Sequence, residues 1–251
     1  MDRYALQVAF NRLGEEGQKR LRQARAAVVG LGALGGVCVT NLCRAGVGTL
    51  RFADNKRVEL GNLPRQVLFF ENDVKDRVYK TDAAVKRLGE MNSETRLEPF
   101  TAEINADNIG SFIDNADVVL DATDNMETRF IINEECFKRK LPWIYCGILG
   151  SRGMTANIIP GGPCLCCIMP PETMKTGYPT TYTDGVINMA AGVMASVSTA
   201  EAVKIITGSP DVRGTLMVMD LWKNTTDYIS VSRDPQCPVC GRHGGKYELS
   251  D

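Results

Sequence analysis

Two short cysteine motifs constrain this chain more than any other feature, because together they supply four thiols that can meet at one point. The sequence reads CLCC at 164–167 and CPVC at 237–240. A tetrahedral structural zinc site takes two thiolates from each of two such turns, which here are Cys164, Cys167, Cys237 and Cys240. The two motifs lie too far apart for a compact zinc ribbon, so the metal would tie the end of the chain to its middle. The alternative is two unrelated pairs of ordinary cysteines.

Length and composition suit one large folded unit. With 251 residues, 44% of them hydrophobic and 24% charged, the chain is expected to form a single domain over 1–251. A formal net charge of −1 gives no electrostatic reason to expect nucleic acid or an anionic membrane as a partner. The first ten residues show no signal-peptide pattern, and the small-residue run 190–202 is expected to be too short to span a bilayer. Nine cysteines, an odd number, then favour metal binding in a reducing, cytoplasmic compartment.

Short apolar strands alternate with helices between residues 26 and 150. The expected strands are Ala26–Leu31, Thr49–Ala53, Arg96–Thr101, Asp117–Asp121 and Trp143–Cys146. The expected helices are Ala33–Ala45, Val78–Met91 and Met126–Arg139, with a long loop over Asp54–Lys75. This order predicts an α/β fold with a doubly wound, Rossmann-like parallel sheet and right-handed crossovers.

A helical arm and a second, differently patterned part flank this nucleotide-binding pattern. The arm occupies 1–25, with its helix over Tyr4–Gln23. The second part, 151–251, is expected to hold a strand, a long loop, a helix and a hairpin, at Thr155–Ile159, Ile168–Asp184, Met189–Thr207, Thr215–Asp220 and Tyr228–Val231. We expect this part to complete the same fold as a C-terminal extension that carries the zinc site and a partner-binding surface.

A glycine-rich turn follows the first strand and opens a helix. Gly30, Gly32 and Gly35 let the backbone approach a phosphate, which the N–H groups at the helix N-terminus can bind. Asp54 ends the next strand, where a carboxylate binds ribose hydroxyls. Taken alone, this pattern fits an NAD-dependent dehydrogenase equally well.

Further polar residues distinguish the two interpretations. Asn62, Arg65 and Lys80 offer the cations and donors that a triphosphate needs. Asp124 follows the fourth strand, at the edge where ligands bind in parallel sheets, and an unpaired carboxylate beside phosphates is a natural Mg²⁺ ligand. A dehydrogenase has no use for this cluster, so the sequence favours ATP. The alternative treats each residue as an ordinary surface charge.

The motifs together resemble the ThiF/MoeB/HesA family, the adenylating relatives of ubiquitin-activating enzymes. The resemblance covers nearly the whole chain and rests on RYxxQ at 3–7, VVGLGALGG at 28–36, RAGVGTLRFAD at 44–54, NLPRQ at 62–66, Lys80, DATDN at 121–125, Arg129 and both CxxC motifs. It implies an adenylyltransferase that activates a carboxylate as an acyl-adenylate and releases pyrophosphate. It further implies a small ubiquitin-like sulfur carrier ending in Gly-Gly as partner, as in thiamine or molybdopterin biosynthesis, and a homodimer with one Zn²⁺ per chain.

The resemblance also assigns roles by position. It makes Arg65, Lys80 and Asp124 catalytic, with Asp124 holding Mg²⁺. It places these around ATP together with Gly30, Gly32, Gly35, Asp54, Asn62, Gln66 and Asn125.

Two positions depart from the family pattern and keep other functions open. Leu6 stands where the family usually has a second arginine, and Thr181 stands where it often has a cysteine that carries a covalent intermediate. Chemistry would then stop at the adenylate, or another thiol would act. The competing hypotheses are adenylation of another carboxylate (a peptide or a small cofactor precursor), a dehydrogenase, and a non-catalytic binding protein with the same fold.

Overall fold

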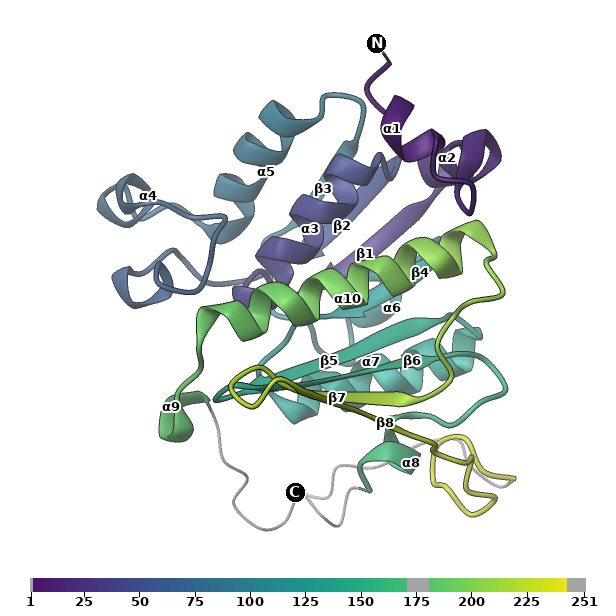
Figure 1. Cartoon of the computed structure of the whole chain (residues 1–251). Helices are drawn as coiled ribbons and strands as arrows, with labels where there is room; N and C mark the ends of the chain where they lie inside the picture. The colour runs from purple at the N-terminus through teal and green to yellow at the C-terminus, as the bar shows by residue number, and fades with distance from the viewer. Residues whose placement is uncertain (1, 171–180, 243–251) are drawn as a thin grey trace.

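A computed structural model of the chain describes residues 2–170 and 181–242. Its described strands form one sheet in the order β3-β2-β1-β4-β5-β6-β7-β8 (Figure 1). Their bounds are β1 Arg25–Val29, β2 Thr49–Ala53, β3 Arg96–Phe100, β4 Val118–Asp121, β5 Trp143–Leu149, β6 Arg152–Ile158, β7 Leu216–Asp220 and β8 Thr225–Ile229.

The first five strands run parallel, as the alternating pattern predicts. β1 lies between β2 and β4, β3 flanks β2, and β5 flanks β4. The chain therefore winds outward from β1 in both directions, which is the doubly wound arrangement. The carboxyl ends of these strands meet at one edge, where such sheets bind ligands.

The other three strands make the sheet mixed rather than wholly parallel. β5 and β6 are joined only by Gly150 and Ser151, and so short a connection forces antiparallel pairing. β6, β7 and β8 are likewise antiparallel to their neighbours, and the expected hairpin is β7–β8. The C-terminal part thus extends the nucleotide-binding sheet.

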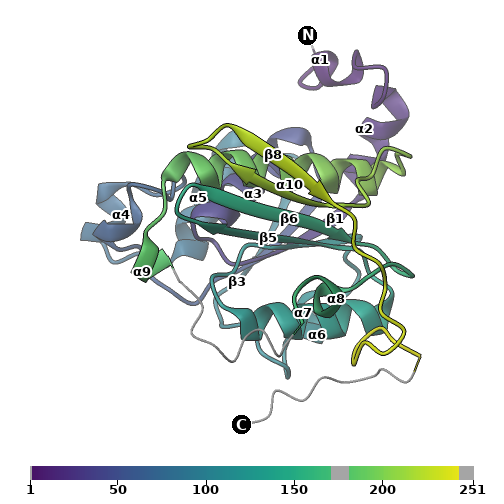
Figure 2. The same cartoon turned by 60° about the horizontal axis from the view of Figure 1, so that its bottom comes forward.

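Helices cover both faces of the sheet (Figure 2). Ala26 and Val28 of β1 pack into the core beneath α3 and α10, whereas Ala27 and Val29 pack into the core beneath α6 and α7. This alternation is what a strand buried on both faces requires. The described helices are α1 Ala5–Val8, α2 Gly14–Gln23, α3 Ala33–Ala45, α4 Glu71–Lys75, α5 Lys80–Met91, α6 Ile109–Phe112, α7 Met126–Arg139, α8 Leu165–Ile168, α9 Thr181–Asp184 and α10 Asn188–Thr207, with a 3₁₀ turn η1 at Leu60–Asn62.

Several expectations drawn from the sequence need correction. The N-terminal arm is two helices, the long loop after β2 contains η1 and α4, and α6 was not expected. Elements of three to five residues carry too few apolar positions to show a period. The long loop expected over Ile168–Asp184 is entered from α8 and left through α9, and its residues 171–180 lie outside the described part.

Helix α10 is longer than the small-residue run suggested. By length and composition alone, its 20 residues make it the one helix in the described part that could cross a membrane. In this fold Ala191, Met194 and Ala195 are buried in the same core as α3 and the sheet. The length test is passed by the whole helix and not by the run 190–202 alone, and packing in this core accounts for the helix's apolar character.

Candidate nucleotide and metal sites

The glycine-rich turn joins β1 to α3 at the carboxyl edge of the sheet. Gly30 has φ +94°, and a Cβ there would lie 2.7 Å from the carbonyl oxygen of Ala122. A Cβ on Gly35 would lie 1.9 Å from the carbonyl oxygen of Gly30. The turn can therefore close against α3 only with glycine at both positions. Gly32 is the N-cap of α3 and has no side chain to cap it, which leaves the helix N-terminus able to bind an anion.

Asp54, the residue after β2, is tied to this turn. Its Oδ2 accepts a hydrogen bond from the Leu31 N–H at 2.9 Å, and its Oδ1 accepts one from the Lys56 N–H at 2.8 Å. The Nζ of Lys80 lies 3.8 Å from the same Oδ2. The structure therefore places the carboxylate expected to bind ribose directly beside the glycine turn.

Lys80 is the first residue of α5 and is buried. Burial lowers the pKa of its ammonium group, while the charges of Asp54 and Asp124 act in the opposite direction. Because Asp124 contributes to this shift, it lies within electrostatic reach of Lys80. The fold thus brings together a lysine and two acidic residues that are far apart in the sequence.

Asp124 is exposed in the turn between β4 and α7. The next residue, Asn125, is the N-cap of α7, and its Oδ1 accepts a hydrogen bond from the Thr128 N–H at 2.8 Å. Asn125 therefore has a structural role in this protein, whatever contact its amide makes with a nucleotide.

A buried ion pair supports this turn; its two residues belong to the motifs that carry the family resemblance, but neither is among the residues predicted for the site. Asp121 and Arg129 meet through Oδ2 and Nε at 3.0 Å, with side chains 0% and 11% exposed. Burial raises the pKa of Asp121, which the charge of Arg129 counteracts. A charged residue that ends an otherwise apolar strand was the signal that could have identified the pair.

The turn at 59–66 carries the remaining residues expected in the site. Asn62 accepts a hydrogen bond from the Glu59 N–H at 3.2 Å, and Arg65 donates one to the Gly61 carbonyl at 2.7 Å. Gln66 is buried, and its Oε1 has no partner in the described structure. Its Nε2 lies 3.9 Å from the point where a Cβ on Gly32 would stand. Gln66 therefore lies beside the N-terminus of α3, and its carbonyl oxygen is an acceptor without a donor.

An open cavity of about 520 Å³ lies beside Asn62 and Arg65. Its other wall is formed by Gly185 and Val186, which follow α9, and by Asn188, the first residue of α10. Residues 171–180, the centre of the expected long loop, lie outside the described part. The candidate nucleotide residues therefore border a space large enough for a second substrate.

The four cysteines of the two motifs converge in the described structure. All four Sγ atoms lie within 4.8 Å of one another, and the facing pairs Cys164–Cys237 and Cys167–Cys240 are 3.5 Å and 3.4 Å apart. Four sulfurs around a tetrahedral zinc, each about 2.3 Å from the metal, stand about 3.8 Å apart. The donor set and its spacing fit Zn²⁺. Cys166 is not part of this cluster.

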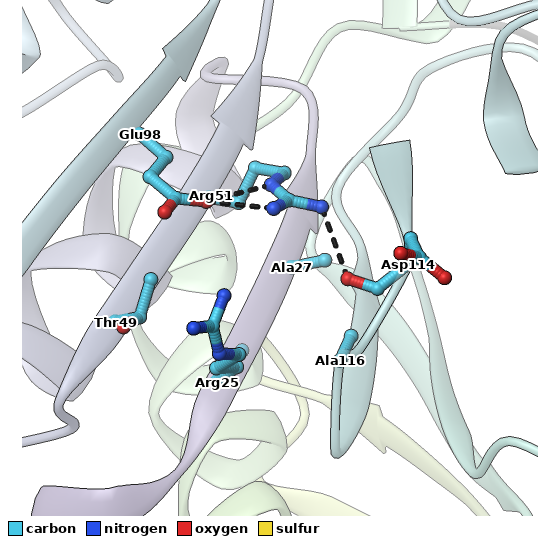
Figure 3. A pocket seen from close by; sticks show the side chains of 8 residues that line it. Arg25, Ala27, Thr49, Arg51, Glu98, Asp114 and Ala116 are labelled. Atoms are coloured by element: carbon cyan, nitrogen blue, oxygen red, sulfur yellow. Dashed lines mark hydrogen bonds and ion pairs between the residues drawn. The ribbon is translucent and has the colours of Figure 1, made fainter. Parts of the chain in front are cut away.

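A second, much smaller cavity lies at the opposite end of the sheet (Figure 3). Its volume is about 10 Å³, with walls that include the first residues of β1 and β2. Arg51 bridges it, with Nε 2.9 Å from Glu98 and Nη1 2.7 Å from the Phe112 carbonyl. The cavity has room for about one water molecule and is not a substrate site.

Comparisons with known proteins identify the family of this chain. The sequence profile of the ThiF family matches residues 4–239. The chain is 38% identical over 242 residues to the Bacillus subtilis sulfur carrier protein ThiS adenylyltransferase, covering 95% of this chain and 71% of that protein. It is 33% identical over 258 residues to the Thermus thermophilus sulfur carrier protein adenylyltransferase, covering 100% and 94%. The SAMP-activating enzyme E1 of Haloferax volcanii is 31% identical over 245 residues, covering 97% and 90%.

Solved structures support the same fold. The crystal structure of Escherichia coli MccB with MccA-N7isoASN superposes with a TM-score of 0.83 over 96% of this chain and 75% of MccB, at 22% identity. MccB with ATP gives a TM-score of 0.79 over 90% and 69%, at 23% identity. At such identities the likeness establishes the fold alone. The family profile and the sequence relatives go further: this chain belongs to the ThiF family and is an adenylyltransferase that activates a carboxylate.

Proposed function

We propose that the chain uses Mg-ATP to adenylate the C-terminal Gly-Gly carboxylate of a ubiquitin-like sulfur carrier protein. The observation that carries this proposal is the convergence of Asp54, Lys80 and Asp124 beside the uncapped N-terminus of α3. A helix N-terminus and a buried lysine suit phosphates, and the two carboxylates suit a ribose and a divalent cation. The names of the sequence relatives supply the sulfur carrier as the substrate class.

In this proposal the reaction is a displacement at the α-phosphorus of ATP. A carrier carboxylate oxygen forms the new P–O bond, and the bond to the bridging oxygen of pyrophosphate breaks. Lys80 and Arg65 offset the charge on the phosphate oxygens, and Asp54 orients the ribose. Mg²⁺, held by Asp124, would supply further charge neutralisation. No general base is required, because the attacking carboxylate is already ionised at neutral pH.

The residues near the α3 N-terminus would complete the nucleotide site. Asn62 and Gln66 supply amide groups, and the unpaired Oε1 of buried Gln66 is an acceptor to which an O–H or N–H of the bound nucleotide would donate. The Oδ1 of Asn125 caps α7, so its Nδ2 is the group that would contact the nucleotide. The cavity beside Arg65 would admit the carrier tail, since two glycines can pass where side chains cannot.

Zinc would hold the C-terminal extension together. Cys164, Cys167, Cys237 and Cys240 have the spacing that Zn²⁺ requires, and all four positions are filled by protein. Such a closed site has no open position for substrate, so its role is structural. We further propose a cytoplasmic homodimer, for which the exposed Leu6 and Phe10 of the N-terminal arm offer apolar contact surface.

Pyrophosphate exchange tests the proposal. The full chain is incubated with Mg-ATP, labelled pyrophosphate and the ThiS carrier of Bacillus subtilis, and label entering ATP is counted. Exchange that requires the carrier, and that disappears when its last two glycines are removed, supports the proposal. If neither carrier form supports exchange, and calorimetry shows tight NAD binding and no ATP binding, the proposal is wrong.

The second candidate is the same chemistry on another carboxylate, such as a peptide or a small cofactor precursor. Leu6, which is 83% exposed, stands in place of the family's usual arginine. The fold also resembles that of MccB, which has been crystallised with MccA as well as with ATP. ATP binding without exchange on ThiS, followed by exchange on a short peptide, would select this candidate.

A further inference from the structure

The buried pair Asp121–Arg129 holds both ends of the residue that precedes Asp124. Asp121 Oδ1 accepts hydrogen bonds from the Thr123 N–H at 2.9 Å and from the Thr123 hydroxyl at 2.6 Å. Arg129 Nη2 donates to the Thr123 carbonyl at 2.7 Å. That carbonyl belongs to the peptide bond joining Thr123 to Asp124. The two charged side chains therefore fix the peptide plane from which the Asp124 side chain projects.

Arg129 is itself immobilised by the neighbouring strand. Its guanidinium lies over the ring of Tyr145, 5.3 Å from the centroid, and its Nε pairs with Asp121 at 3.0 Å. On the other side of Asp124, Asn125 caps α7. Asp124 is thus an exposed residue between two anchored neighbours, which is unusual for a loop turn.

The full burial of Asp121 leaves its carboxylate to act through its protein partners. Asp121 is fully buried and Arg129 is 11% exposed. Buried ion pairs contribute little net stability relative to well-packed apolar residues, because desolvation offsets their attraction. A pair of this kind is better explained by the geometry it imposes than by the stability it adds.

We propose that Asp121 and Arg129 are positioning residues that set the orientation of the Asp124 carboxylate for a divalent cation. This inference rests on the proposed role of Asp124 in holding Mg²⁺. If the carboxylate loses its fixed direction, the metal-dependent part of ATP binding weakens. The metal-independent part, which comes from the glycine turn, Asp54 and Lys80, stays unchanged.

Calorimetry of ATP binding to the full chain separates these parts without requiring the carrier. ATP is titrated once with excess Mg²⁺ and once with EDTA, and the ratio of the two affinities is the metal advantage. Asp124→Asn is expected to remove this advantage. Arg129→Lys, which keeps the charge, and Asp121→Asn, which keeps the shape, are expected to reduce it about tenfold while the affinity in EDTA stays constant.

Arg51→Lys is the matched control. Arg51 also pairs with a carboxylate through Nε and donates to backbone carbonyls, but it does so at the far end of the sheet (Figure 3). It is expected to lose some thermal stability and to keep the wild-type metal advantage. Thr123→Val is a milder variant for the case in which the charge variants fail to fold, because it removes only the hydroxyl bonds to Asp121 and to the Asn125 carbonyl. Its metal advantage is expected to fall by severalfold.

The outcomes are distinct. If Asp124→Asn retains the wild-type metal advantage, the proposed role of Asp124 fails. If Asp124→Asn loses it while folded Arg129→Lys, Asp121→Asn and Thr123→Val retain it, the positioning role alone is wrong. An equal loss in Arg51→Lys would show that the effect follows stability and not the orientation of Asp124.

Discussion

The Nζ of Lys80 lies 3.8 Å from Oδ2 of Asp54, and these side chains are only 6% and 10% exposed. The same Oδ2 accepts the Leu31 N–H of the glycine turn. One carboxylate therefore links the ends of two elements, the turn after β1 and the start of α5, and it keeps a lysine charge where phosphates would bind. Without Asp54, a buried ammonium at this point would be strongly disfavoured.

Replacing Lys80 or Asp124 with alanine is expected to leave the fold intact and to reduce adenylation by about 100-fold or more, because each supplies charge near the phosphates. Asp124 is exposed, and Lys80→Ala removes a charge whose burial is unfavourable. The measurement is carrier-dependent pyrophosphate exchange, with thermal melting as the check on folding. Wild-type exchange in either variant would refute the assignment.

The lowered pKa of Lys80 predicts an alkaline limit to activity. Because burial lowers this pKa, the ammonium loses its proton below the ordinary lysine value, and kcat/KM for ATP should fall there. Bound phosphates stabilise the charged form, so the fall in kcat should come at higher pH. Lys80→Arg is expected to shift the kcat/KM limit upward, and an unshifted limit would assign it to another group.

The lowered pKa of Lys80 also makes the free energy of unfolding depend on pH. Between the lowered folded-state pKa and the ordinary lysine value, the unfolded chain keeps the Lys80 proton whereas the folded protein has lost it. Unfolding then takes up a proton, so the Lys80 contribution to the free energy of unfolding rises with pH in this window. Comparing wild type with Lys80→Met by denaturant unfolding across alkaline pH isolates the effect, and a fall with pH in that difference would contradict it.

The parallel half of the sheet and its glycine turn could be predicted from sequence because local patterns determine them. Helices α3 and α7 begin and end where the sequence predicts, since each combines a long apolar pattern with clear flanking signals. The placement of Asp54, Lys80 and Asp124 at one edge also follows from strand order, because carboxyl ends of parallel strands meet. No local pattern, however, states which charges pair, and so Asp121–Arg129 was missed.

The elements that sequence reasoning missed are short or depend on distant contacts. The helices α4 and α6 and the turn η1 are brief and stabilised by tertiary packing. β6 runs antiparallel to β5 because a tight connection at Gly150 joins the two strands. The sequence pattern predicts a strand only from Thr155, so it does not reveal this connection. The convergence of the four cysteines was predictable because two short turns with two thiols each typically bind one zinc ion.

Removal of zinc is expected to lower the melting temperature. Metal analysis of reduced, freshly purified protein should give one zinc per chain, and a strong chelator should destabilise the fold, since metal binding at a closed site is coupled to folding. Cys240→Ser should lose the metal. Cys166→Ala is the matched control, because Cys166 lies outside the four-sulfur cluster, and it should retain one zinc. A zinc-free wild type would refute the site.

Thr181 leads to the last prediction, that no covalent carrier intermediate forms at this position. Thr181 is the first residue of α9, a short helix that ends just before Gly185. The Gly185 carbonyl accepts a hydrogen bond from Gly150 at 2.9 Å, which fixes the end of this segment against the β5–β6 turn beside the cavity. A threonine hydroxyl has no anionic form near neutral pH, whereas a thiol is partly ionised and strongly nucleophilic. The adenylate should then pass directly to an external nucleophile.

Intact mass spectrometry checks this after incubation with Mg-ATP and the ThiS carrier. Wild-type protein is expected to show no enzyme–carrier adduct, with or without reductant. Thr181→Cys restores the thiol and is the matched comparison: it is expected to form an adduct that reductant or hydroxylamine removes. A labile adduct in the wild type would mean that another thiol, such as Cys166, performs the transfer, and it would show that the absence of cysteine at 181 does not end the chemistry at the adenylate.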